Sequence, residues 1–184
     1  MEVPVNDAPV PRTSFNALAR ERTIARFPDV EPSVIGLGLA LARVAHHHTT
    51  YSEAILHRPR GLKWTGFRLL HLLWLFESLS ARDLARHTQI SRQTVSNITR
   101  GLEQQGWVER HRDPSDHRLM TLRLTPAGRT VIEQALRDQF RLDAQWFEVL
   151  DSSEQRELVR LLELVRVRIA SQRPEPAGED VSAW

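Results

Sequence analysis

The chain contains no cysteine, and it has a single lysine, Lys63, among 25 basic residues. The absence of cysteine excludes disulfides, thiol catalysis, cysteine-based zinc fingers and thiol redox sensing. Long hydrophobic runs are also missing, because the most apolar stretch, LLHLLWLF, is about half as long as a membrane span and lies between Arg68 and Glu77. The N-terminus lacks the basic and apolar regions of a signal peptide. We therefore expect a cytoplasmic protein with no membrane partner.

Motifs typical of enzymes are equally scarce. No glycine-rich phosphate loop, serine nucleophile motif or paired-carboxylate arrangement stands out. The sequence therefore favours a protein that is not an enzyme and needs no cofactor. The 184 residues, 41% hydrophobic and 26% charged, are typical of a soluble globular protein, either one domain or a small module with a helical extension.

Positive charge is concentrated in one segment. The net charge is only +2, but residues 81–128 hold eight arginines and five acidic residues, which leaves −1 for the rest of the chain. A basic lobe on a nearly neutral body suits a polyanionic partner. A solvated surface would have much the same composition, so charge alone leaves both interpretations open.

Periodicity and capping residues predict a mainly α-helical first half. Ser14 is expected to cap a short helix, and Pro32 opens a longer helix that extends through Leu56. Residues 64–76 form a largely buried helix after the break at RPRGL. One stripe of the long helix consists of Leu37, Leu41, Val44, His48, Tyr51 and Ile55.

Two short helices and a hairpin come next. Ser80 is expected to cap a helix at 81–88, and Ser91 caps another that ends near Gly106. Residues 107–112 and 119–124 are strand-like runs around the turn-forming loop DPSDHR. Two further helices follow, one after the pair Thr125-Pro126 and one after the capping box of Asp151 and Glu154. This order describes a winged helix-turn-helix with a two- or three-stranded β-wing.

The helix after Ser91 has two contrasting sides. Val95, Ile98 and Leu102 share the face that must pack on the domain. The opposite face carries Gln93, Ser96, Asn97 and Arg100. Glutamine and asparagine can make paired hydrogen bonds to adenine, and arginine to guanine, in the major groove. An ordinary surface helix has similar residues, but the nearby hairpin with Arg110, Arg112 and Arg118 favours double-stranded DNA as the partner.

The same segments resemble the MarR-type transcriptional regulators. The likeness runs from LSARDLARHTQIS at 79–91 through the segment 94–128, in which GLEQQGWVER, Asp113, the Asp116-x-Arg118 signature and LTPAG match the family pattern. GLKWTGFRLLHLL resembles the family's second core helix, with Lys63 where threonine is more usual. The resemblance covers roughly residues 32–171.

This resemblance implies a homodimer whose N- and C-terminal helices intertwine. Each recognition helix would enter a major groove and each wing a flanking minor groove, where Arg118 would bind and Asp116 would hold its guanidinium. The same pair could instead be a salt bridge that only stiffens a turn. Ser80, Arg82 and Ser91 would hold phosphates at helix N-termini, although both serines are also explained as caps.

Taken together, these arguments give the following predicted sites. The DNA contacts are Ser80, Arg82, Ser91, Arg92, Gln93, Thr94, Ser96, Asn97, Arg100, Arg110, Arg112, Asp116, His117 and Arg118. The dimerisation seam is Leu158, Leu162, Val165 and Ile169. The expected organisation is a flexible tail (1–13), dimerisation and core helices (14–76), the DNA-binding lobe (77–125), C-terminal dimerisation helices (126–172) and a second flexible tail (173–184).

The resemblance also implies a small-molecule effector, often an aromatic acid, bound between the dimer helices and the DNA-binding lobe. The candidate pocket residues are His48, Tyr51, Trp64, Phe67 and His71. Aromatic residues at helical spacing are also typical of plain core. A urate-responsive branch of the family uses a tryptophan in an N-terminal extension, and this chain has none before Trp64.

The histidine run at 46–48 raises the alternative of a zinc-responsive regulator. Consecutive helical residues point about 100° apart, so these three side chains cannot converge on one ion. A site would need ligands from elsewhere, such as His57, His71 or Glu53, and we predict no metal. The sequence thus predicts a homodimeric repressor released from a pseudo-palindromic operator by a small ligand. The alternative is a helical dimer whose winged domain binds protein.

Overall fold

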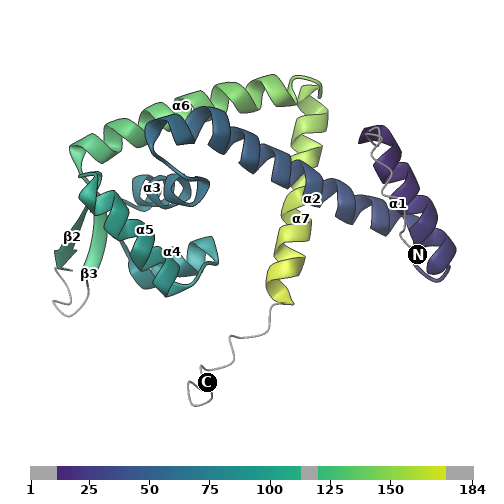
Figure 1. Ribbon diagram of the computed structural model, residues 1–184, viewed down its shortest axis with the longest axis horizontal. Helices are drawn as coiled ribbons and strands as arrows, with labels where there is room; N and C mark the ends of the chain where they lie inside the picture. The colour runs from purple at the N-terminus through teal and green to yellow at the C-terminus, as the bar shows by residue number, and fades with distance from the viewer. Residues whose placement is uncertain (1–11, 113–119, 173–184) are drawn as a thin grey trace, which may run out of the picture. The chain divides into compact units, whose positions relative to one another are not determined.

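The computed structural model describes residues 12–112 and 120–172 of the chain. The helices are α1 (Arg12–Arg26), α2 (Pro32–Ser52), a π-helical turn (Glu53–His57), a 3₁₀ turn (Arg58–Arg60), α3 (Trp64–Phe76), α4 (Ala81–Thr88), α5 (Arg92–Gln104), α6 (Pro126–Phe147) and α7 (Ser152–Ser171). The strands are β1 (Leu79–Ser80), β2 (Val108–Arg112) and β3 (Met120–Leu124) (Figure 1). This mainly helical fold with a small antiparallel sheet confirms the predicted winged helix-turn-helix class.

One predicted helix boundary in the first half is wrong, and a second helix changes type before its predicted end. Helix α1 begins at Arg12, so Ser14 lies inside the helix and does not cap it. Because arginine has a higher helix propensity than serine, the helix extends upstream to include Arg12. Helix α2 begins at Pro32 as predicted, but its α-helical part ends at Ser52, and the chain continues as a π-helical turn.

The side chain of Glu53 makes two contacts where the π-helical turn begins. Its Oε2 accepts a hydrogen bond of 2.8 Å from the backbone N–H of Trp64, the first residue of α3. Its Oε1 accepts one of 3.2 Å from Arg58. The π-helical turn therefore begins at a carboxylate that is hydrogen-bonded to the start of α3 across the loop. Gly61 ends the 3₁₀ turn with a left-handed φ of 73°.

The core of the winged lobe lies between α3, α4, α5 and the sheet. Leu69, Leu70 and Leu73 of α3 are fully buried, as are Leu84 of α4 and Val95 of α5. The sheet has the strand order β1-β3-β2 with antiparallel pairs throughout. The predicted caps of this lobe are confirmed, since the hydroxyl oxygens of Ser80, Ser91 and Thr125 accept hydrogen bonds from backbone N–H groups at the starts of α4, α5 and α6.

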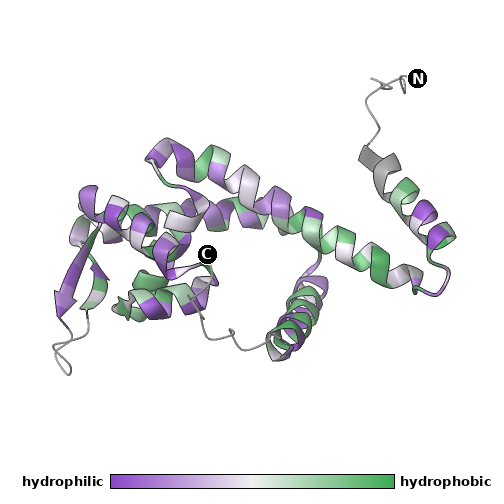
Figure 2. Ribbon diagram, turned by 60° about the horizontal axis from the view of Figure 1, so that its bottom comes forward, coloured by the Kyte–Doolittle hydropathy of each residue, from purple (hydrophilic) through white to green (hydrophobic). Residues whose placement is uncertain are grey.

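The chain divides into two compact units within α6, between Ala135 and Leu136. In the second unit, the capping box of Asp151 and Glu154 is present as predicted at the start of α7. Gln155 donates hydrogen bonds of 3.0 Å to the carbonyl oxygens of Phe147 and Leu150, which ties α7 to the end of α6. Figure 2 shows apolar residues along α7, and none of its residues is buried within the chain.

Candidate nucleic-acid interface

Helix α5 packs on the lobe with one side and exposes the other. Val95 and Leu102 are buried, as the sequence predicts, while Ile98 is only half-buried. The sequence analysis missed Thr99, which is fully buried and whose hydroxyl donates to the carbonyl oxygen of Ser96 at 3.2 Å. Threonine is polar and was therefore not predicted to be buried. Only its spacing of four residues from Val95 indicates that it lies on the buried face.

The opposite side of α5 presents a continuous polar surface. The exposed residues there are Arg92, Gln93, Thr94, Asn97 and Arg100, and Ser96 is half-buried. Gln93 Nε2 donates to Asn97 Oδ1 at 3.4 Å, so the two amides lie one turn apart and restrain each other. An exposed helix with paired amides and two arginines can offer several hydrogen bonds to base edges and phosphates.

The two described arginines of the wing differ in their surroundings. Arg110 makes a bidentate ion pair with Glu103 of α5, with Nε at 2.5 Å from Oε1 and the terminal nitrogen at 3.3 Å from Oε2. Arg112 is exposed and makes no ion pair with another residue in the described part of the chain. Because Glu103 belongs to α5, its ion pair turns the guanidinium of Arg110 toward the body of the lobe. Asp113, Asp116, His117 and Arg118 lie outside the described residues.

The start of α4 holds two further predicted contacts. The hydroxyl of Ser80 accepts from the N–H of Asp83 at 3.1 Å and donates to Oδ2 of the same residue at 2.6 Å. Its single proton is therefore already engaged, which favours the cap interpretation of Ser80. The Ser91 hydroxyl lies 2.8 Å from Thr94 Oγ1, and either hydroxyl of this pair can be the donor. The side chain of Arg82 is exposed.

Four of the five candidate pocket residues form one aromatic cluster on α2 and α3. The ring centroids of His48 and Trp64 are 5.6 Å apart, those of Trp64 and Phe67 5.4 Å, and those of Phe67 and His71 6.0 Å. Phe67 is only 3% exposed and belongs to the core, whereas Tyr51 is 52% exposed. Burial lowers the pKa of His71 below its ordinary value.

The cluster contains a fifth ring that the sequence analysis named only as a possible metal ligand. His57 is fully buried and stacks on Phe67 with the ring centroids 4.1 Å apart. Within residues 12–112 and 120–172, no group of three or more histidine, aspartate or glutamate side chains is arranged to hold a metal ion. In the same part of the chain, no helix is both long enough and apolar enough to cross a membrane.

Comparisons with known proteins agree with this architecture. The MarR family profile matches residues 62–120. The HTH-type transcriptional repressor Rv2887 of Mycobacterium tuberculosis is 33% identical over 105 residues, which cover 57% of this chain and 76% of that protein.

Two solved structures share the fold. A MarR mutant from E. coli complexed with operator DNA matches with a TM-score of 0.64 and 22% identity, covering 72% of this chain and 95% of that chain. BpsR of Bordetella bronchiseptica, whose DNA binding is regulated by 6-hydroxynicotinic acid, matches with a TM-score of 0.63 and 24% identity, covering 71% and 98%. The winged lobe, the family profile and the repressor relative together establish that the chain belongs to the MarR family of transcriptional regulators.

Proposed function

We propose that the protein is a homodimeric transcriptional repressor that binds a pseudo-palindromic operator and is released from it by a small ligand. The observation that carries this proposal is the exposed polar side of α5, with Gln93, Asn97 and Arg100 opposite the buried Val95 and Leu102. Such a helix fits the major groove, and its amide and guanidinium groups match the pattern of donors and acceptors on base edges. The other predicted DNA contacts keep their proposed roles, including Asp116 and Arg118.

Unpartnered apolar surface supports the homodimer. Leu162, Val165 and Ile169 of α7 are 44%, 46% and 62% exposed within the chain, and Leu37 of α2 is 70% exposed. Large apolar side chains exposed on each of these helices mark interfaces in soluble proteins. A two-fold dimer would place two α5 helices in successive major grooves, about 10 base pairs apart.

The aromatic cluster supports a ligand with an aromatic ring and an acidic group. Trp64 and His48 are half-buried and in edge-to-face contact, which leaves part of both rings available to a bound ring. His48 or His71 would donate a ring N–H to the acid, and His71 would do so in its neutral form because burial lowers its pKa. The DNA binding of BpsR is regulated by 6-hydroxynicotinic acid, which is an aromatic acid of this class.

The direct test is fluorescence anisotropy with DNA from immediately upstream of the coding region. A scrambled duplex of equal length is the control, and both are titrated at two salt concentrations. We expect tight binding to the upstream duplex alone, weakened by salt. The Asn97→Ala variant should lose about 1–3 kcal/mol of discrimination, whereas Gln145→Ala, which removes an exposed amide on α6, should not. Equal, weak binding of both duplexes would favour a winged domain that binds protein.

A further inference from the structure

The chain turns sharply between α3 and β1, at Glu77. This residue has a φ of 64° and a ψ of −43°, and across it the N–H of Ser78 donates to the carbonyl oxygen of Phe76 at 2.6 Å. The result is a γ-turn of the strained type, which residues with a Cβ atom rarely adopt. Gln89, the other non-glycine residue with a positive φ in the described part of the chain, has the ordinary left-handed values of 60° and 30°. Strained residues persist only where their surroundings hold them, and they are concentrated at functional sites.

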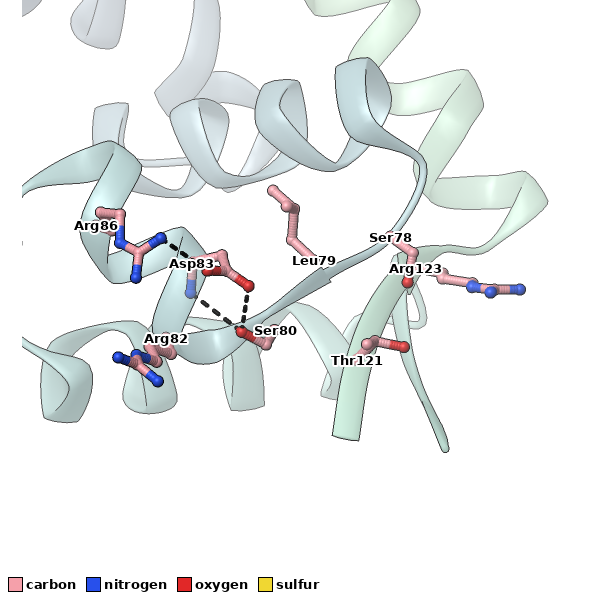
Figure 3. Close-up of a pocket in the computed structure, with 8 residues that line it drawn as sticks. All are labelled: Ser78, Leu79, Ser80, Arg82, Asp83, Arg86, Thr121 and Arg123. Atoms are coloured by element: carbon pink, nitrogen blue, oxygen red, sulfur yellow. Dashed lines mark hydrogen bonds and ion pairs between the residues drawn. The ribbon is translucent and has the colours of Figure 1, made fainter. Parts of the chain in front are cut away.

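The turn at Glu77 determines where the helix-turn-helix begins. The next residues, Leu79 and Ser80, form β1 and pair with β3. Figure 3 shows the chain passing through both residues into α4, where the Ser80 hydroxyl accepts from the N–H of Asp83 at 3.1 Å and donates to its carboxylate at 2.6 Å. Strand β1 and the start of α4 are therefore joined by local hydrogen bonds, so the direction of the chain at Glu77 also sets the direction of α4.

The start of α6 contacts the chain at both ends of the helix-turn-helix. Before α4, a terminal nitrogen of Arg129 lies 3.3 Å and 3.4 Å from the two carboxylate oxygens of Glu77. After α5, the carbonyl oxygen of Trp107 accepts from the N–H of Thr125 at 3.0 Å. Residues 78–106 therefore begin and end at two contacts with the start of the same helix.

A third contact joins α6 to the helix before the turn. One turn further along α6, Glu133 Oε1 accepts from Nε1 of Trp74 in α3 at 3.2 Å. We call the contacts made by Thr125, Arg129 and Glu133 the α6 clamp. The ion pair within it contributes little to stability, because the side chains of Arg129 and Glu77 are 43% and 74% exposed. Its effect is on geometry, since it ties the carboxylate of the strained residue to α6.

We propose that Glu77 is a positioning residue for DNA recognition: its strained turn, held by Arg129, fixes the helix-turn-helix at one angle to the start of α6. This inference rests on the proposed function and gives a route for its regulation. Helix α6 extends past Ala135 into the second compact unit, so a change there that tilts α6 acts on both ends of the segment that holds α4 and α5. Such coupling requires an element with two arrangements, and the turn supplies them, strained when the ion pair is closed and relaxed when it is open.

DNA binding and thermal unfolding of the full chain together test the proposal. Glycine adopts a positive φ without steric cost, so Glu77→Gly should keep or raise the melting temperature. It should nevertheless weaken operator binding by about 2- to 30-fold, the range for residues that couple two sites without touching either ligand. Removing an acidic group would by charge alone strengthen binding to DNA. Glu148→Gln, at an exposed position after α6, is the control for that charge effect.

The role of Arg129 is tested through the same pair. Relative to its charge control, Arg129→Gln should also weaken operator binding, and adding it to Glu77→Gln should cause no further loss, since both changes open one contact. Arg129→Lys keeps the charge and should retain most of the affinity. Arg137→Gln, at an exposed arginine of α6, is the charge control because it removes a positive charge outside the clamp.

Hydrogen exchange of the DNA-free chain gives a readout that needs no operator. In Glu77→Gly, the amides of residues 81–104 should exchange faster, while those of α3 stay as slow as in the parent. Affinities equal to those of the charge controls would overturn the proposal, and so would parallel losses of affinity and melting temperature, which indicate a merely structural residue. If the parent chain binds no DNA, the proposed function fails and exchange alone decides. Equal protection of α4 and α5 in the variant and the parent would then overturn the positioning role.

Discussion

A Cβ atom placed on Gly128 would lie 1.9 Å from the carbonyl oxygen of Trp107. The first turn of α6 therefore rests directly on the backbone that enters β2. Thr125 holds the same junction, because its N–H donates to Trp107 O at 3.0 Å and its hydroxyl donates to Gly106 O. The hydroxyl oxygen also accepts from Gly128 N at 3.0 Å. These contacts give a physical reason for the threonine and the glycine in LTPAG.

The Gly128→Ala substitution should destabilise the fold, since the clash is with backbone and neither segment can move alone. We expect a loss of about 3 kcal/mol in the free energy of unfolding, at the upper end of ordinary overpacking. Denaturant unfolding measures it. Gly101→Ala is the control, because nothing lies within 4 Å of its added Cβ, and a helical alanine there should gain up to about 1 kcal/mol. Equal midpoints for Gly128→Ala and the parent would contradict the close contact.

Glu53 should stabilise the fold in a pH-dependent manner. The backbone N–H of Trp64 and, more weakly, Arg58 lower the pKa of the Glu53 carboxyl below its ordinary value of 4.5, and partial burial opposes them. A lowered folded-state pKa means that the unfolded chain binds the proton more readily. The stabilisation is thus fully present above pH 4.5 and disappears as the pH falls through the lower folded-state pKa.

The Glu53→Gln variant tests this role. At neutral pH it should cost about 1 kcal/mol, which is typical for the loss of a charged acceptor at a helix N-terminus. The difference from the parent should shrink as the solution is acidified below pH 4.5. Glu148→Gln, at an exposed position after α6, is a control with the same change of charge. A difference that stays constant between pH 7 and about pH 3 would show that the carboxylate charge contributes nothing.

Local signals in the sequence predicted most of the fold. The caps at Ser80, Ser91 and Thr125 are side-chain hydrogen bonds within three residues, so spacing alone reveals them. The Glu53 contact spans 11 residues and crosses the loop between two helices. Such contacts depend on how the helices and strands pack together. The periodicity of hydrophobic residues along the sequence does not predict them.

Arg110 and Arg112 should contribute unequally to DNA binding, although the sequence places both on the wing. The ion pair of Arg110 with Glu103 restrains its guanidinium, whereas Arg112 is exposed. We expect Arg112→Ala to weaken operator binding more than Arg110→Ala, as measured by anisotropy at low salt. Glu103→Gln should release Arg110 and partly restore its attraction for DNA. Because exposed pairs contribute about 0–1 kcal/mol, neither arginine substitution should change the melting temperature greatly. A larger loss of affinity for Arg110→Ala would reverse the assignment.

Helix α7 offers the sharpest test of the homodimer. Leu162 and Val165 lie on its predicted seam and are nearly half exposed within the chain. If a second copy covers them, aspartate at either position would bury an unpaired charge, which costs several kcal/mol. Leu162→Asp and Val165→Asp should therefore shift sedimentation equilibrium toward the monomer and abolish tight operator binding. Arg156→Asp, an exposed position on the opposite side of α7, is the matched control and should remain dimeric. A dimer that persists in both seam variants would place the interface elsewhere, and the apolar side of α2, with Leu37 70% exposed, would be the next surface to substitute.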